Sequence, residues 1–138
     1  MSSAENKAVV RQYFEVFHNQ RQLDLGEQIL QSELLTPTLG MAAMMRTAFP
    51  DYQITIDDQI AEGDRVGTVW TASGTHEGEW ASPIGPVAPS GKAVTWPGTT
   101  TLRIAGGKIA EVIGTNWDHL GILQLLGALP ATAPRPGA

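Results

Sequence analysis

The order of apolar and polar residues divides the chain into a helical first part and a later part built of strands. In residues 4–18, apolar side chains recur at steps of three and four, which predicts an amphipathic helix opened by a serine. Smaller apolar clusters predict a second short helix at 23–30 and a third at 41–49. Pro50 is expected to end the third helix.

Beyond Pro50 the pattern is typical of β-structure. Segments dense in Val, Ile, Thr and Trp predict four strands, at residues 52–60, 65–75, 93–104 and 108–117. Glycine-containing turns at 62–64 and 105–107 predict tight antiparallel hairpins, whereas 78–91 is expected to be a long Pro/Gly-rich link. A last short helix is expected near 120–127. Helices followed by antiparallel strands favour an α+β fold with a curved sheet.

Composition narrows the possible classes of protein. The length of 138 residues suits one domain, expected at 1–130 and followed by a flexible Pro/Ala-rich tail at 131–138. A net charge of -5 with nine scattered Lys and Arg argues against nucleic-acid partners. With no cysteine and no zinc-ligand spacing among the three histidines, we expect no metal site. No secretory signal or long apolar run is present, so we expect a cytoplasmic protein without membrane contacts.

The leading candidate for chemistry is Asp118, at the predicted junction of the last strand and the last helix. A carboxylate withdrawn from water at a pocket mouth has a raised pKa and can transfer protons. The alternative is that Asp118 caps the helix. Asn116 has the same strand parity as Asp118, so its amide could polarise a substrate carbonyl or cap the sheet edge.

Other candidates lie on the first helix and the second strand. His76 follows a strand that places it on the same face as Trp70, so it could face a cavity or bond to a backbone carbonyl. Tyr13 lies on the apolar stripe of the first helix, as a core residue or as a catalytic hydroxyl. His18 and His119 are expected at the surface or as capping residues. The candidate substrate-binding wall is aromatic, and its residues are Phe17, Trp70, Trp80, Trp96 and Trp117.

Five segments follow one another along the chain: Phe49-Pro50-Asp51, AEGDRVGTVWTASGTHEGEW, PSGKAV, RIAGGKIAEV and WDHLGILQLLGALP. In this order and spacing they resemble the SnoaL-like polyketide cyclase family, which shares the fold of nuclear transport factor 2. The similarity covers roughly residues 5–130. Each piece alone is an ordinary hairpin or helix signal, but together they are specific.

The resemblance implies a cone-shaped, curved antiparallel sheet wrapped around N-terminal helices and enclosing one apolar cavity. It also implies an aspartate, matched by Asp118, that acts as general acid/base in an intramolecular aldol closure of a polyketide intermediate, without cofactor or metal. His76 and Tyr13 match further site positions. The chain departs from the family in a short 31–41 segment without histidine and a longer, proline-rich 79–89 segment.

The sequence is compatible with two other functions. The same scaffold could carry an epoxide hydrolase or a hydratase-type enzyme, or it could be a non-catalytic module that binds a small molecule. In each case the expected partner is an apolar or aromatic small molecule. A homodimer or higher homo-oligomer is expected, because an open sheet leaves one broad face to cover.

Overall fold

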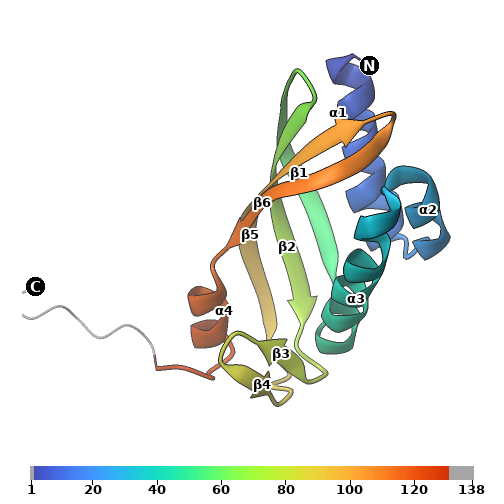
Figure 1. The fold of residues 1–138 in the computed structure, drawn as a ribbon. Helices are drawn as coiled ribbons and strands as arrows, with labels where there is room; N and C mark the ends of the chain where they lie inside the picture. The colour runs from blue at the N-terminus through green and yellow to red at the C-terminus, as the bar shows by residue number, and fades with distance from the viewer. Residues whose placement is uncertain (1, 131–138) are drawn as a thin grey trace, which may run out of the picture.

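The computed structural model describes residues 2–130, so the tail expected at 131–138 lies outside the described residues. Helices α1 to α3 lie on one side of a curved antiparallel sheet, and α4 lies near the start of β5 and the end of β6 (Figure 1). The α+β class expected from the sequence is confirmed. None of the helices in residues 2–130 is long and apolar enough to cross a membrane.

The first helix is α1 (Ser3–Gln12), which continues directly into the π-helical segment η1 (Tyr13–Asn19). It begins with a capping box: the Ser2 hydroxyl accepts from the N–H of Glu5 at 3.1 Å, and the Glu5 carboxylate accepts from the N–H of Ser2 at 3.2 Å. The helix predicted for 4–18 is therefore confirmed. Its second half, however, has the wider turn of a π-helix.

The remaining helices before the sheet are η2 (Leu23–Leu25), α2 (Gly26–Ile29) and α3 (Ser32–Ala48). The prediction for the third helix was too short, because α3 already begins at Ser32 and contains Pro37. A proline there removes one backbone donor. The helix nevertheless forms because it buries a stripe spaced by three and four residues: Thr38, Ala42, Met45 and Ala48.

The main sheet has four antiparallel strands in the order β1-β2-β5-β6. Their bounds are Gln53–Glu62, Arg65–Thr75, Ala93–Ala105 and Lys108–Trp117. Both predicted hairpins are confirmed, since β1 pairs with β2 and β5 with β6 across the glycine turns. The link expected to be irregular also contains a small hairpin, of β3 (Trp80–Ser82) and β4 (Gly85–Val87). Helix α4 (His119–Leu125) follows β6.

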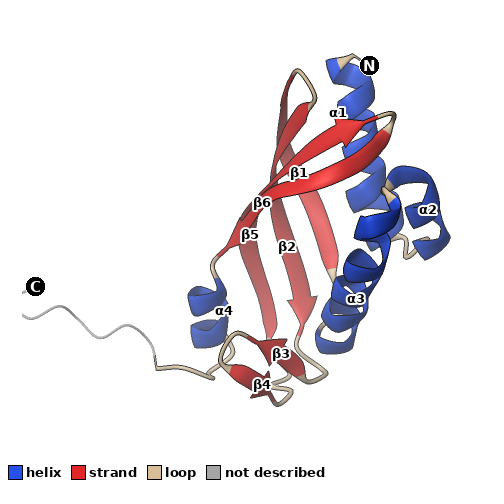
Figure 2. Ribbon diagram, in the orientation of Figure 1, coloured by secondary structure: helices blue, strands red, loops and turns tan. Residues whose placement is uncertain are grey.

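Alternate residues of the central strand β5 face the helices and are buried: Val94, Trp96, Gly98, Thr100, Leu102 and Ile104. The three N-terminal helices cover this face, and the core lies between them and the sheet (Figure 2). Strand β6 follows the alternation only in part, because its register to β5 shifts twice. At one shift, Val112 pairs with Leu102 and Gly114 with Thr101, so Ile113 is an extra residue.

Candidate functional site

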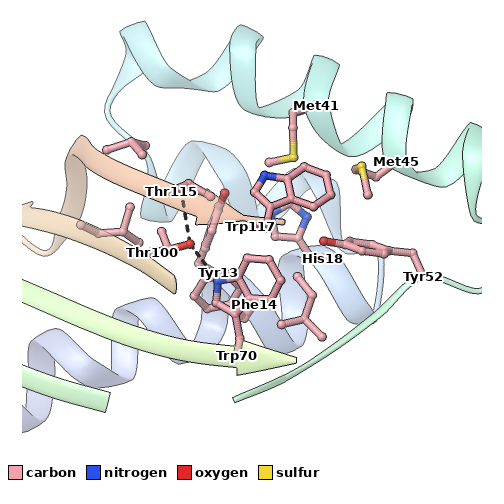
Figure 3. Close-up of a pocket in the computed structure, with 13 residues that line it drawn as sticks. Tyr13, Phe14, His18, Met41, Met45, Tyr52, Trp70, Thr100, Thr115 and Trp117 are labelled. Atoms are coloured by element: carbon pink, nitrogen blue, oxygen red, sulfur yellow. Dashed lines mark hydrogen bonds between the residues drawn. The ribbon is translucent and has the colours of Figure 1, made fainter. Parts of the chain in front are cut away.

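A cavity of about 280 Å³ lies between η1, α3 and the helix-facing side of the sheet. Figure 3 shows Met41 and Met45 reaching into it from α3. Its aromatic lining consists of Tyr13, Phe14, Tyr52, Trp70 and Trp117. Its other polar lining consists of His18, Thr100 and Thr115. Met41 and Val112 also line the cavity and are 39% and 46% exposed, so the cavity opens to solvent between α3 and β6.

The π-helical turn decides which side chains η1 directs into this cavity. Tyr13 and His18 are five positions apart, a separation that an α-helix places on different faces and a π-helix brings together. Both are buried, with ring centroids 4.6 Å apart in an edge-to-face arrangement. The expectation that His18 is a surface or capping residue was therefore wrong. It is the main residue that the sequence analysis missed, and the only signal for it was its proximity to the aromatic stripe.

The setting of His18 keeps its imidazole neutral. Burial, with a smaller effect from the Arg46 guanidinium, lowers the pKa of His18 from 6.5 to about 4. Arg46 donates to the backbone carbonyl of His18 and, at 2.6 Å, to that of Tyr52. Its guanidinium also lies 5.6 Å from the centre of the Tyr52 ring. Arg46 thus joins the end of η1 to the start of β1.

The two tyrosines of the cavity remain protonated at neutral pH. Burial raises the pKa of Tyr13, and burial followed by the neighbouring Tyr13 raises that of Tyr52. In the part of the chain that the structure describes, neither hydroxyl makes a hydrogen bond, and the His18 ring makes none. These three side chains are therefore free to bond to a molecule in the cavity.

The sheet side of the cavity is held by a small hydrogen-bonded group. The indole N–H of Trp70 donates to the Thr100 hydroxyl at 2.9 Å, and the Thr115 hydroxyl donates to the same oxygen at 3.4 Å (Figure 3). Gly98 makes room for the Trp70 ring, since a Cβ at this position would lie 2.2 Å from it. The glycine therefore allows Trp70 to lie against β5 as a flat wall.

The structure brings three of the predicted site residues together at the cavity: Tyr13, Trp70 and Trp117. The other three aromatic candidates, Phe17, Trp80 and Trp96, are core residues that do not line it. Trp96 stacks behind Trp117 with ring centroids 5.8 Å apart, so it supports the wall without forming its surface. The sequence analysis expected these three residues to contact a substrate, but none of them lines this cavity.

Asp118 does not have the dry environment that the sequence hypothesis required. It is exposed, and its carboxylate accepts from the N–H of Gly121 at 2.8 Å as the N-cap of α4. Asn116 is exposed too. Along β6, Thr115 and Trp117 pair with the helix-facing residues Thr100 and Gly98 of β5 and face the cavity, whereas Asn116 pairs with Thr99 on the opposite face. Of the two interpretations of Asp118, the capping role matches its geometry.

His76 is buried but does not line the cavity. Its Nδ1 accepts from the N–H of Ser90 at 3.1 Å and lies 3.0 Å from the Ser90 hydroxyl. Burial lowers the pKa of His76, and the carbonyls of Val87 and Gly78 partly oppose this. The ring thus anchors the segment between β4 and β5. No group of three potential metal ligands occurs within residues 2–130.

A curved antiparallel sheet packed on N-terminal helices around an apolar cavity defines an α+β fold of the nuclear transport factor 2 type, a scaffold with room for a small molecule. The sequence profile of the SnoaL-like polyketide cyclases matches residues 7–126, and the chain belongs to this family. A comparison with curated proteins found no match.

Solved structures agree with this assignment. AclR from Streptomyces galilaeus, a putative hydroxylase, is 27% identical, with a TM-score of 0.80 over 98% of this chain and 88% of that one. TsrD from Streptomyces laurentii is 19% identical, with a TM-score of 0.81 over 94% and 99%. A putative SnoaL-like polyketide cyclase from Jannaschia sp. CCS1 is 20% identical, with a TM-score of 0.78 over 93% and 95%. The last two show the fold alone.

Proposed function

We propose that this protein is a cofactor-independent cyclase that holds a small polyketide-like intermediate in its cavity and promotes an aldol-type ring closure. The observation that carries the proposal is the cavity itself. It is mostly apolar, has flat aromatic walls at Trp70 and Trp117, and contains a few polar side chains near Tyr13. This combination is typical of sites that bind a small organic molecule and fix its orientation. Family membership makes a polyketide-like ligand the first choice.

The size of the cavity limits what it can take. A volume of about 280 Å³ lies at the lower end of the range for small-molecule sites. A compact substrate of one or two rings would therefore fit inside, and a larger one would extend through the opening at Met41 and Val112. Holding a flexible chain with its reacting carbons in contact can lower the barrier by about 7 to 11 kcal/mol.

An aldol closure also needs a group that moves a proton. In the sequence hypothesis this group was Asp118, but an exposed carboxylate that caps a helix is poorly placed for a molecule in the cavity. Among residues 2–130, the titratable side chains that line the cavity are Tyr13, His18 and Tyr52. We therefore place proton transfer inside the cavity.

The test is turnover of a synthetic aromatic poly-β-ketone ester, followed by mass spectrometry. Aldol closure gives a product of unchanged mass, or one lighter by a water molecule, and the rate should depend on the protein. An Asp118→Asn variant should retain turnover. Loss of turnover in that variant, with ligand affinity intact, would return the proton transfer to Asp118. Failure of the wild-type protein to bind or convert any such ester would remove the cyclase proposal.

Two specific observations support other functions of the same cavity. The similarity to AclR, at 27% identity, makes hydroxylation the second candidate. With dioxygen and a two-electron reductant added to the assay, hydroxylation is recognised by a product heavier by one oxygen. The lining contains no carboxylate, lysine or arginine within the described residues, which favours a binding module. Tight binding of the ester without any change in its mass would support that function. The same lack of carboxylates weighs against an epoxide hydrolase or hydratase.

A further inference from the structure

The inner end of the cavity, formed by Tyr13, His18 and Tyr52, contains polar groups that the protein itself leaves unused. Tyr13, His18 and Tyr52 are 7%, 4% and 6% exposed. Nothing in residues 2–130 forms a hydrogen bond with either hydroxyl or with the imidazole. In Figure 3 the Tyr52 hydroxyl points to the side of the cavity where His18 lies. All three side chains line the cavity, so their polar atoms are placed to bond to a ligand that carries polar atoms of its own.

The backbone around the inner end is fixed by side-chain hydrogen bonds. Arg46 binds the carbonyls of both His18 and Tyr52. Next to it, the Asn19 amide accepts from the N–H of Ile54 at 2.8 Å and donates to the carbonyl of Ile54 at 2.7 Å. The end of η1 and the start of β1 therefore cannot separate easily. Such support is what a site needs if it holds reacting groups in a constant geometry.

The charges near the inner end favour negative charge on a bound molecule. Arg21 and Arg46 line a smaller hollow of about 150 Å³ on the other side of His18. Arg46 has no carboxylate within salt-bridge distance in the described chain, and the nearby Asp51 carboxylate is bonded to Thr75. Arg46 also favours the ionised form of Tyr52. Its positive charge therefore favours an oxyanion at the inner end and disfavours a protonated His18.

We propose that the inner end is an enolate-binding subsite for a β-dicarbonyl unit, in which Tyr13 and Tyr52 donate to the carbonyl oxygens and His18 removes a proton from the carbon between them. This deepens the proposed function and rests on it. In the step, the C–H bond breaks and its electron pair becomes the C=C bond of the enolate. The carbonyl oxygen gains the negative charge, and the proton forms an N–H bond on the imidazole.

The state of each group at neutral pH suits this step. Burial holds the pKa of His18 near 4, so the imidazole is unprotonated and can accept a proton, but it is a weak base. A weak base requires an acidic C–H bond, and a methylene between two carbonyls is more acidic than one beside a single carbonyl. This restricts the substrate class to β-dicarbonyl compounds. The raised pKa values of Tyr13 and Tyr52 keep both hydroxyls as donors.

The first experiment compares two probes with the same carbon skeleton, 1-phenylbutane-1,3-dione and butylbenzene. Binding is followed through tryptophan fluorescence, because Trp70 and Trp117 line the cavity. Tyr13→Phe and Tyr52→Phe should each weaken binding of the dione about 5-fold, the value of one hydrogen bond, and leave the hydrocarbon unchanged. Phe17→Leu is the matched control, since Phe17 stacks on Tyr13 at 5.8 Å without lining the cavity. It should affect both probes equally.

The second experiment measures exchange of the central methylene protons of the dione with deuterated water. The wild-type protein should accelerate exchange, and His18→Gln should reduce this acceleration about 100-fold while the dione still binds. Unchanged exchange in that variant would overturn the role of His18.

Equal losses for dione and hydrocarbon in both tyrosine variants would overturn the subsite and leave the cyclase proposal intact. If neither probe binds the wild-type protein, the cyclase proposal itself fails. Should His18→Gln not fold, exchange in Tyr52→Phe gives the deciding result, since its aromatic packing is preserved.

Discussion

The buried histidine gives a prediction that does not depend on any substrate. In the unfolded chain His18 takes up a proton near pH 6.5, whereas in the folded protein it does so only near 4. Between these values the unfolded state binds more protons, so the free energy of unfolding rises with pH in this window. Above pH 6.5, protonation of His18 therefore does not lower the free energy of unfolding. As the pH falls from there towards 4, the folded protein loses stability. Below that the loss stops, because the folded histidine is protonated too.

The size of this effect follows from the two pKa values. A fall from 6.5 to about 4 corresponds to about 3 kcal/mol, since each tenfold change in proton affinity is worth about 1.4 kcal/mol. The pKa of His76 is also lowered, but its contribution is common to wild type and variant. The difference between wild-type protein and His18→Phe therefore isolates His18.

The measurement is urea unfolding by circular dichroism, at constant ionic strength, over the pH range from 7.5 to 4.5 or so. Between those limits the wild type should lose about 2 to 3 kcal/mol more than His18→Phe. Phe14→Leu is the control, because it loosens the same aromatic cluster without removing a titrating group, and it should keep the wild-type pH dependence. If wild type and His18→Phe lose the same free energy, His18 is not buried in the neutral form and the account of the inner end is wrong.

Three further predictions concern the frame of the cavity. Gly98→Ala should cost about 1 to 3 kcal/mol of unfolding free energy, because its Cβ would lie 2.2 Å from a buried indole ring, whereas Gly114→Ala, with its nearest neighbour at 3.9 Å, should be close to neutral. Equal effects of the two changes would contradict the packing described. Asn19→Ala removes both hydrogen bonds to Ile54 and should cost about 1 to 3 kcal/mol, seen as a lower Tm. Asp118→Ala removes a helix cap, so it should lower the free energy of unfolding by about 1 kcal/mol and leave the affinity for butylbenzene unchanged. A large loss of affinity in this variant would place the Asp118 carboxylate at the cavity.

Much of the fold could be predicted from the sequence because the signals are local. The apolar stripe of α1, the glycine turns that close the β1-β2 and β5-β6 hairpins, and the alternation along β5 all follow from steric and periodic rules that act over a few residues. The ordered motifs of the family added the arrangement of these elements around a cavity. Tyr13, Trp70 and Trp117 line the cavity at positions that follow from regular helix and strand periods.

The rest of the site depends on two places where the period changes. The π turn of η1 moves His18 onto the face of Tyr13, and the two register shifts of β6 turn Val112 toward the cavity in place of its neighbours Glu111 and Ile113. The π turn shifts the phase of the side chains that follow it, whereas in β6 the second shift cancels the first, so the apolar pattern on either side stays the same. The sequence by itself therefore determined the elements, their order and the family. Only the tertiary structure decided which groups face the cavity, because packing between η1, β1, β5 and β6 selects where the helix and the strand depart from their regular periods.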